Sequence, residues 1–190
     1  NNFWRIQDRS IMGTIKATNI EPIADNGTVT LGSSGDTFSL GSGVLQSNML
    51  YPAWSVYNDS AQSIASATAT TVIFNQERFD TANAFASNTF TVPSGQGGKY
   101  FISAGIRVQD GAFGRYIRLF VNGSQSPTIG DLNYGTSTYG ADCQMNGVVA
   151  FSAGDAITVV ANQHSGSNKN LEALSDGWYR SYFMGYRIGT

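Results

Sequence analysis

The sequence predicts an all-β protein, and three features of its composition carry that prediction. The 190 residues include 22 Gly, and aromatic side chains make up 12% of the chain. Charged residues make up only 13%, about half the share of an average globular domain. Long helices favour Ala, Leu, Glu, Lys and Arg, yet the chain holds only three Glu and three Lys. These features disfavour helical bundles and doubly wound α/β folds, and the length indicates one domain with at most a short appendage.

Three strands are expected in the part of the chain that begins at Pro52. Residues 52–57 form an extended segment after this proline. Residues 71–74 are a run of β-branched and aromatic side chains, which strands favour. In residues 100–108 apolar side chains alternate with mostly smaller or polar ones, and this period of two predicts a strand with one buried face.

The second half of the chain continues the pattern. Residues 115–121 alternate again, with Ile117 and Leu119 on one predicted face and the neighbouring polar and aromatic side chains on the other. The dipeptide Asn122–Gly123 that follows is a turn signal. Further strands are expected at residues 147–151, 156–161 and 182–188. Many short strands without a helical pattern predict a sandwich, jelly roll or barrel.

The first 51 residues differ from the remainder. Residues 28–36 and 37–43 superimpose at a period of nine, so that Thr28 aligns with Thr37 and Leu31 with Leu40. Such short strands, each closed by a Gly-Ser turn, cannot bury a face alone and need stacked copies or strands from other chains. We therefore expect an N-terminal stem or attachment segment at 1–51, shared between chains, and a head domain at 52–190. A flexible Gly/Ser linker is the alternative.

Five short motifs follow one another in an order that is typical of one family. They are F-T-V-P at 90–93, G-K-Y-F at 98–101, V-N-G at 121–123, G-D-A-I-T-V at 154–159 and F-M-G-Y-R-I at 183–188. Over about residues 52–190 this set resembles the globular head of the complement-subcomponent and tumour-necrosis-factor-like superfamily. The resemblance implies a ten-stranded jelly-roll sandwich that assembles as a compact homotrimer. Because the chain is rich in aromatic side chains and poor in charge, a large apolar interface is expected, with Tyr100, Phe183 and Tyr186 as candidates.

Two features of the chain are similar to viral fibres rather than to the animal members of that family. The Gly-X-Y triplets of a collagen stem are absent from the sequence, and the Gly/Ser repeat resembles the stem of a bacteriophage or other viral fibre. Residues 74–80, F-N-Q-E-R-F-D, resemble a segment of viral fibre heads. The hypothesis is a virion structural protein, a tail-fibre head joined to other virion proteins through residues 1–51. The start of the sequence, without Met or a signal-peptide pattern, looks like that of an excised or partial chain.

The resemblance also predicts where such a head would bind its receptor. It implies that both ends of the head lie at the stem side, so that loops at 123–142 and 164–181 fall at the far tip. Aromatic faces beside amide and carboxylate groups suit sugar rings, and exposed Tyr and Trp are favoured anchors in protein interfaces. A host surface glycan or protein is therefore the expected partner, and the alternative for Trp178 and Tyr179 is that they plug the end of the sandwich. The receptor-binding candidates are Asp131, Asn133, Tyr134, Tyr139, Trp178 and Tyr179.

Several classes of function are disfavoured by the sequence. A net charge of −2 gives no basic footprint for nucleic acid, and no stretch approaches the roughly 20 apolar residues of a membrane-spanning helix. A single cysteine excludes an internal disulfide and multi-cysteine zinc modules. No calcium-loop pattern occurs, and we expect no metal and no cofactor.

Catalysis is not expected either. A catalytic dyad would have to pair Cys143 with His164, the only histidine, and the resembled fold assigns them to different sheets. A non-enzymatic trimeric head is therefore the leading hypothesis. A capsid decoration protein that trimerises on the particle is the first alternative. The second is a polysaccharide-degrading fibre enzyme, which would need two carboxylates facing across a groove, although the sequence singles out no such pair.

Overall fold

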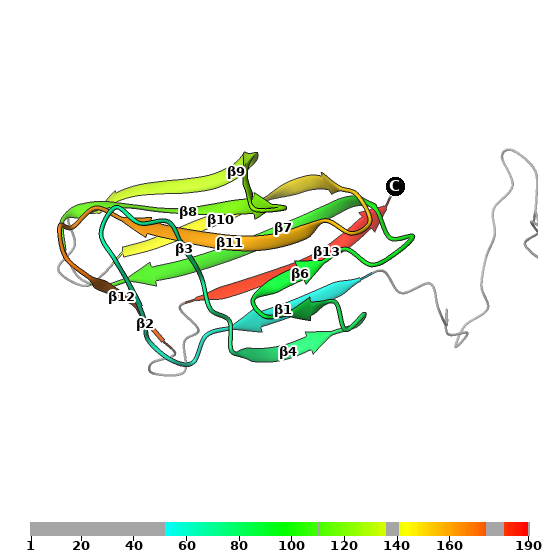
Figure 1. The fold of residues 1–190 in the computed structure, drawn as a ribbon, viewed down its shortest axis with the longest axis horizontal. Coiled ribbons are helices and arrows are strands. Elements are labelled where there is room, and N and C mark those ends of the chain that lie inside the picture. Colours follow the sequence, from blue (N-terminus) through cyan, green and yellow to red (C-terminus); the bar gives the residue numbers. More distant parts are fainter. Residues whose placement is uncertain (1–51, 110, 136–140, 174–180, 190) are drawn as a thin grey trace, which may run out of the picture. The chain divides into compact units, whose positions relative to one another are not determined.

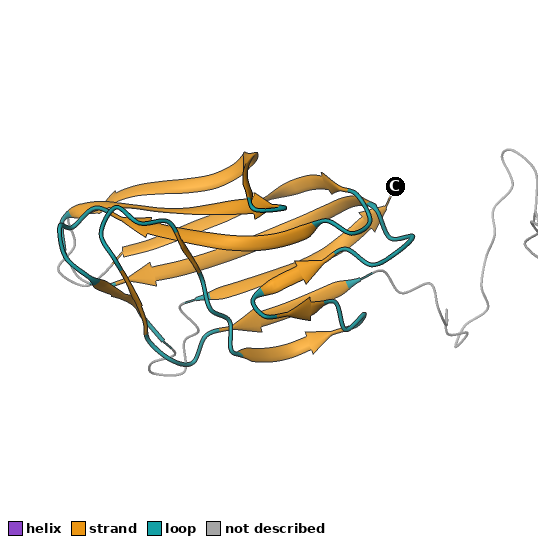
Figure 2. Cartoon of the chain, in the orientation of Figure 1, coloured by secondary structure: helices purple, strands orange, loops and turns teal. Residues whose placement is uncertain are grey.

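The computed structural model describes residues 52–109, 111–135, 141–173 and 181–189, and these form two antiparallel β-sheets without a helix (Figures 1 and 2). The all-β class predicted from composition is thus confirmed, and the two facing sheets are consistent with a jelly roll. The expected count of ten strands is not confirmed, because five of the thirteen strands in this part of the chain have only two or three residues. The predicted stem at 1–51 lies outside the described residues. None of the described residues forms a helix long and apolar enough to cross a membrane.

The strands are numbered in chain order. Their bounds are β1 Ala53–Tyr57, β2 Gln62–Ile64, β3 Thr70–Thr71, β4 Gln76–Asp80, β5 Phe85–Ala86, β6 Thr89–Thr91, β7 Gly98–Val108, β8 Phe113–Val121, β9 Ser124–Gly135, β10 Ala141–Phe151, β11 Ala156–Gln163, β12 Lys169–Leu171 and β13 Tyr182–Gly189. The strands predicted at 52–57, 100–108, 115–121, 147–151, 156–161 and 182–188 correspond to β1, β7, β8, β10, β11 and β13. The prediction at 71–74 is wrong for most of its length, because only Thr71 lies in a strand, β3.

The two sheets combine strands that are distant in the sequence. The seven-stranded sheet has the order β2-β12-β7-β13-β1-β4, and β10 pairs with the other side of β7. The six-stranded sheet has the order β5-β6-β11-β8-β9, and β3 also pairs with β11. In the centre of the first sheet β13 lies between β1 and β7, with Tyr186 opposite both Ala53 and Phe101. The strands β4 and β5 are therefore edges, one in each sheet.

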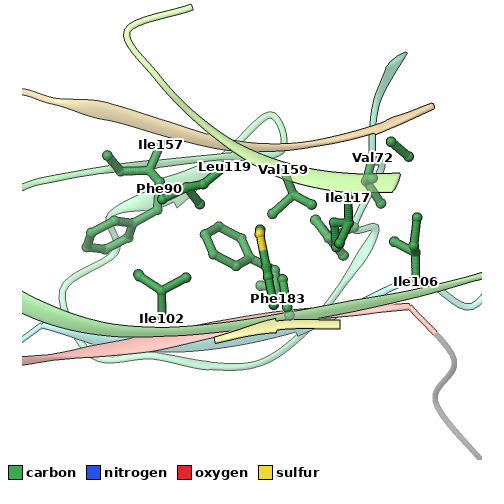
Figure 3. Close-up of a cluster of buried hydrophobic side chains, with 14 of the residues drawn as sticks. Val72, Phe90, Ile102, Ile106, Ile117, Leu119, Ile157, Val159 and Phe183 are labelled. Carbon is green, nitrogen blue, oxygen red and sulfur yellow. The ribbon is translucent and has the colours of Figure 1, made fainter. Parts of the chain in front are cut away.

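The hydrophobic core fills the space between the sheets (Figure 3). Alternate side chains of β7 and β8 point into it, and Ile102, Ile117 and Leu119 are fully buried. At its centre the Trp54 ring stacks on Phe90, with 3.6 Å between ring centroids, and so joins the two sheets. Burial of one large apolar side chain contributes about 1.5–3 kcal/mol to stability, so this interior is the main source of stabilisation.

The packing around Gly185 explains why the closing F-M-G-Y-R-I motif contains a glycine. Gly185 lies in β13 directly opposite Trp54 of β1, on the face that points into the core. A Cβ atom at this position would lie 2.5 Å from Cη2 of Trp54 and 2.7 Å from the carbonyl oxygen of Phe101. The large indole therefore fits only because the residue across the strand pair has no side chain.

The turns follow the sequence signals in one case and not in another. The backbone φ angles of Asn122 and Gly123 are 51° and 77°, as the hairpin turn between β8 and β9 requires. The glycine-rich sequence of residues 95–99 favours a hairpin turn, but the structure has none there. Strands β6 and β7 belong to different sheets, so this segment connects the sheets, and the Gln96 N–H donates to the Pro93 carbonyl across a tight turn.

The predicted loop at 123–142 is also wrong for most of its length. Strand β9 occupies Ser124–Gly135, and β10 begins at Ala141 rather than at 147. The sequence of β9 contains Pro, Asp, Asn and two Gly, which have low strand propensity. Its pairing with β8 supplies the backbone hydrogen bonds that make this segment a strand. The second predicted loop, at 164–181, contains the short strand β12.

Candidate interaction surface

The outer face of the seven-stranded sheet carries exposed apolar side chains. In β13 the alternation buries Phe183 and turns Met184, Tyr186 and Ile188 outward, and these three are between 38% and 51% exposed. Val148 of β10 is 51% exposed and points the same way. We call the following set the outer face: Phe79, Phe101, Val148, Met184, Tyr186 and Ile188.

The strand register brings these side chains together. Tyr186 lies opposite Phe101, which in turn lies opposite Val148, and the two aromatic rings are 5.5 Å apart. In the next row, Ser55 of β1 lies between Met184 and Phe79. The apolar side chains are therefore neighbours across β10, β7 and β13, and Ser55 separates Phe79 of β4 from Met184. Contiguous exposed apolar patches of this kind mark interfaces in soluble proteins.

The three predicted trimer-interface residues separate in the structure. Tyr186 lies on the outer face, whereas Tyr100 and Phe183 are fully buried between the sheets. Tyr100 packs against Trp54 and its hydroxyl donates to the Gln96 carbonyl at 2.7 Å. The parity of β13 could have distinguished two of the three, because residues three positions apart in a strand point to opposite faces.

Burial has an electrostatic consequence at Tyr100. It raises the pKa of the Tyr100 hydroxyl, because the ionised form is poorly solvated between the sheets, and the positive charge of Arg187 acts in the opposite direction. Arg187 is itself almost buried, and its Nε and Nη2 both donate to the Gly97 carbonyl, at 3.1 and 2.8 Å. These contacts fix the connection between β6 and β7 to the end of β13.

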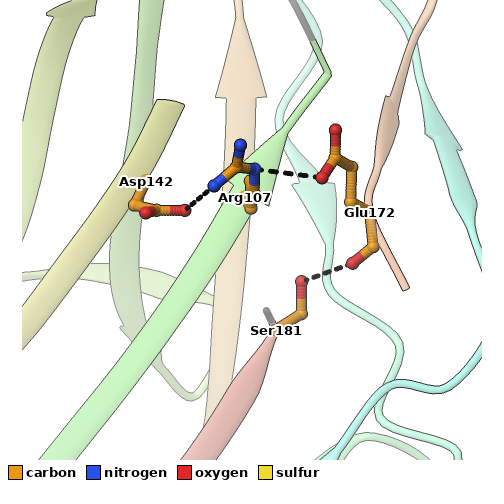
Figure 4. A network of polar contacts seen from close by, with 4 residues as sticks. All are labelled: Arg107, Asp142, Glu172 and Ser181. Carbon is orange, nitrogen blue, oxygen red and sulfur yellow. Dashed lines mark hydrogen bonds and ion pairs between the residues drawn. The ribbon is translucent and has the colours of Figure 1, made fainter. Parts of the chain in front are cut away.

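A polar cluster lies on the same side of the seven-stranded sheet, near the C-terminal end of β7 (Figure 4). Arg107 of β7 lies between two carboxylates, with Nε 3.0 Å from Glu172 Oε2 and Nη1 3.7 Å from Asp142 Oδ1. Ser181 donates to the Glu172 carbonyl at 3.4 Å and so ties the residue before β13 to the segment after β12. This arrangement of an apolar centre and a charged margin is typical of protein interfaces.

The predicted receptor-binding residues are only partly within the described structure. Asp131, Asn133 and Tyr134 lie in β9, paired with β8, and not in a loop as expected. Tyr139, Trp178 and Tyr179 lie outside the described residues. That these six receptor-binding candidates form one surface stays a prediction.

The candidate dyad does not come together. Cys143 is fully buried on the inner side of β10, with its Sγ 3.6 Å from the Arg115 carbonyl. His164 is exposed after β11, and its ring lies near that of Tyr116, with 6.2 Å between centroids. Tyr116 and the inward-pointing Ile117 are adjacent in β8, so His164 is on the outer side of the six-stranded sheet. In the part of the chain that the structure describes, no three His, Cys, Asp or Glu side chains cluster as metal ligands would.

Comparison with solved structures identifies the fold. The globular domain of zebrafish complement 1qA protein matches with a TM-score of 0.52 and 15% identity, over 73% of this chain and 98% of that chain. Murine APRIL, crystallised at pH 8.5, matches with a TM-score of 0.54 and 14% identity, over 73% and 99%. The Eiger TNF from S. frugiperda matches with a TM-score of 0.56 and 11% identity, over 74% and 94%. The structural neighbours are thus complement C1q-type heads and tumour-necrosis-factor-like domains, and at these identities the likeness concerns the fold alone.

Two further comparisons found no relative from which a function could be inferred. No protein-family model matches the sequence, and no curated protein matches it. The three solved structures, and not these two searches, confirm the resemblance drawn from the five motifs, as a statement about the fold. The activity, partners and location of the chain have to be argued from its own residues.

Proposed function

We propose that this chain is the non-enzymatic, homotrimeric head of a viral fibre and that it recognises a host cell surface. The outer face of the seven-stranded sheet carries the proposal, because it leaves Tyr186, Val148 and Met184 between 38% and 51% exposed in one contiguous patch. Water contact with such a patch is unfavourable, and burial against other copies of the chain removes it.

Three copies are proposed because the superfamily that the sequence resembles implies a compact trimer. The fibre assignment derives from the sequence: a Gly/Ser repeat in residues 28–43 instead of collagen triplets, and the F-N-Q-E-R-F-D segment at 74–80. The mechanism is multivalent. Three weak receptor sites on one rigid trimer act at high effective concentration, so that avidity exceeds the affinity of one site by about 10²–10⁴.

The assembly is tested by light scattering at micromolar chain concentration. The unmodified chain should give three times its mass of 20.3 kDa. Val148→Glu and Tyr186→Glu each bring a charge without a partner into the proposed contact, a change that costs about 3–5 kcal/mol when the charge is buried, and both should dissociate the trimer. The matched control is Ile73→Glu, since Ile73 is 43% exposed but lies outside the outer face. A monomer mass for the unmodified chain contradicts the proposal.

The recognition role is tested separately. The labelled trimer and the Tyr186→Glu variant are compared for adsorption to whole cells and to an array of cell-surface glycans. A head that acts by multivalency should lose most of its adsorption when it becomes monomeric. If the folded trimer adsorbs to no cell or glycan but decorates viral particles, a capsid decoration protein replaces the fibre head.

A further inference from the structure

An open groove lies between the edges of the two sheets. One wall is β4, the edge of the seven-stranded sheet, and the other is the hairpin of β5 and β6, at the edge of the six-stranded sheet. The groove has a volume of about 270 Å³. Its lining residues are Val56, Phe74, Asn75, Gln76, Glu77, Phe85, Ala86, Ser87 and Asn88.

The floor of the groove is aromatic and continuous with the core. Phe74 and Phe85 contact each other edge to face, with 6.4 Å between ring centroids, and both contact the buried Phe183. Val56 completes the floor from β1. Phe74 and Val56 are only 5% and 1% exposed, so the partly buried Phe85 supplies most of the apolar surface that a ligand would meet, and the core holds its ring in place.

Polar groups stand around this floor. A register shift in the pairing of β1 and β4 sets Glu77 opposite Val56, whose side chain points inward, yet Glu77 remains exposed. The Gln76 amide comes from the same strand, and the Ser87 hydroxyl and Asn88 amide come from the facing turn. The lining also includes the Asn75 amide, whose Nδ2 donates to Asp59 Oδ1 and Ser60 Oγ. The groove thus offers a carboxylate, three amides and a hydroxyl, and Lys and Arg are absent from its lining.

The walls of the groove are held before any ligand arrives. Asn88 Oδ1 accepts the Phe74 N–H at 2.9 Å and so joins the turn of one sheet to the approach of β4 in the other. The Asp80 carboxylate accepts the Ala82 and Phe85 N–H groups, at 3.1 and 2.7 Å, and fixes the segment between the walls. The turn between β5 and β6 keeps Ser87 and Asn88 at φ angles of 49° and 64°, as a two-residue hairpin turn requires.

We propose that this groove binds one neutral sugar ring, which names the ligand class of the recognition head and rests on that proposed function. A sugar ring has an apolar C–H face for the ring of Phe85 and hydroxyl groups for Glu77, Gln76 and Asn88. The carboxylate and the lack of cationic lining disfavour phosphates and acidic sugars. The volume is just below the roughly 300–1,000 Å³ of sites for drug-sized ligands, which limits the occupant to about one ring.

The test is a titration followed by backbone amide NMR, with the methyl glycosides of glucose, galactose, mannose and N-acetylglucosamine as probes. At least one probe should give saturable shifts at residues 74–77 and 85–88, with a dissociation constant in the millimolar range. Glu77→Gln keeps the size of the side chain and should weaken binding at least tenfold. Ala86→Trp places a large ring in the groove at an exposed position and should abolish binding.

Two matched controls separate the groove from the surrounding surface. Arg78→Gln changes an exposed charge in the same strand, and Ala82→Trp adds the same ring at an exposed position outside the groove. Both should bind as the unmodified chain does. The proposal is overturned if no probe produces shifts, if the shifts cluster elsewhere, or if Ala86→Trp still binds. Measuring the masses of the same samples distinguishes the two proposals. A trimer that adsorbs to cells but binds no sugar in the groove overturns the groove inference alone. A monomer mass overturns the proposed trimeric head.

Discussion

Replacing Gly185 by alanine should destabilise the two-sheet fold far more than the loss of one glycine usually does. The new Cβ would lie 2.5 Å from Trp54 Cη2, 2.8 Å from Cζ2 and 2.7 Å from the Phe101 carbonyl oxygen. Real Cβ atoms do not approach other atoms this closely, so the indole or the strand pair must move. Neither moves easily, because Trp54 is fully buried and Gly185 is paired on both sides, with β1 and with β7.

The magnitude follows from the contacts of the indole. Overpacking of a close-packed core costs about 1–3 kcal/mol. A displaced Trp54 also weakens its stacking on Phe90 and its edge contact with Phe183, and aromatic pairs contribute about 0.5–1.5 kcal/mol each beyond their area. The expected loss is about 2–4 kcal/mol, which for a chain of this size lowers Tm by roughly 4–16 °C.

The assay is thermal unfolding followed by near-ultraviolet circular dichroism at a fixed chain concentration, since association changes apparent stability. The control is Gly189→Ala, in the same strand, where a Cβ would meet nothing within 4 Å. Its Tm should stay the same or rise slightly, because alanine restricts the unfolded chain. Adding Trp54→Phe should make the cost of Gly185→Ala smaller than in the unmodified background. If Gly185→Ala and Gly189→Ala melt together, the steric argument is refuted.

Four further predictions concern buried side chains. Burial raises the pKa of Tyr100, so the contribution of its neutral hydroxyl to stability is complete below about pH 10 and declines as the pH rises through the folded-state pKa. Tyr100→Phe should flatten this decline in urea titrations at alkaline pH. Equal declines in the variant and the unmodified chain would refute this prediction. Phe183→Ala should lower the free energy of unfolding by about 3–5 kcal/mol, measured by urea denaturation, and a loss below 1 kcal/mol would contradict its place in the core. Arg187→Met removes both hydrogen bonds to the Gly97 carbonyl and should cost about 1–3 kcal/mol in the same assay; an unchanged midpoint would count against that contact. Cys143 should react with a thiol reagent only after unfolding, and rapid labelling of the native chain would show that it is accessible.

Most of the fold could be predicted where the alternation of side chains and the turn signals agree. Strands β7 and β8 have a clear period of two, and each has its buried face where the sequence predicts it. Strand β13 was predicted only as a strand, and it buries Phe183, Gly185 and Arg187 rather than its apolar parity. Strand β9 was missed because its Gly, Pro, Asp and Asn residues signal turns, and only its pairing with β8 makes it a strand. Local sequence could not supply that information, since strand propensity depends on the neighbouring strand.

The candidate sites were less predictable than the fold. The outer face could not be found from β13 alone, because Met184, Tyr186 and Ile188 share one parity and alternation would place this apolar set in the core. The groove could not be found either, because it depends on the register shift in the pairing of β1 and β4 and on a turn that belongs to the other sheet. Neither feature leaves a pattern in one short window of sequence.

The pairing of β13 between β1 and β7 also sets the order in which the chain can fold during synthesis. Strand β1 is made early, yet its neighbour begins at Tyr182, so that roughly 130 residues must follow before the pair can form. At about 5–20 residues per second this delay is on the order of 10 s, long compared with the formation of a hairpin such as β8–β9. During this interval β1 has no partner on that side and one side of β7 stays open, and open strand edges pair readily with other chains. Translation that stalls before β13 should therefore leave this protein in its most aggregation-prone form.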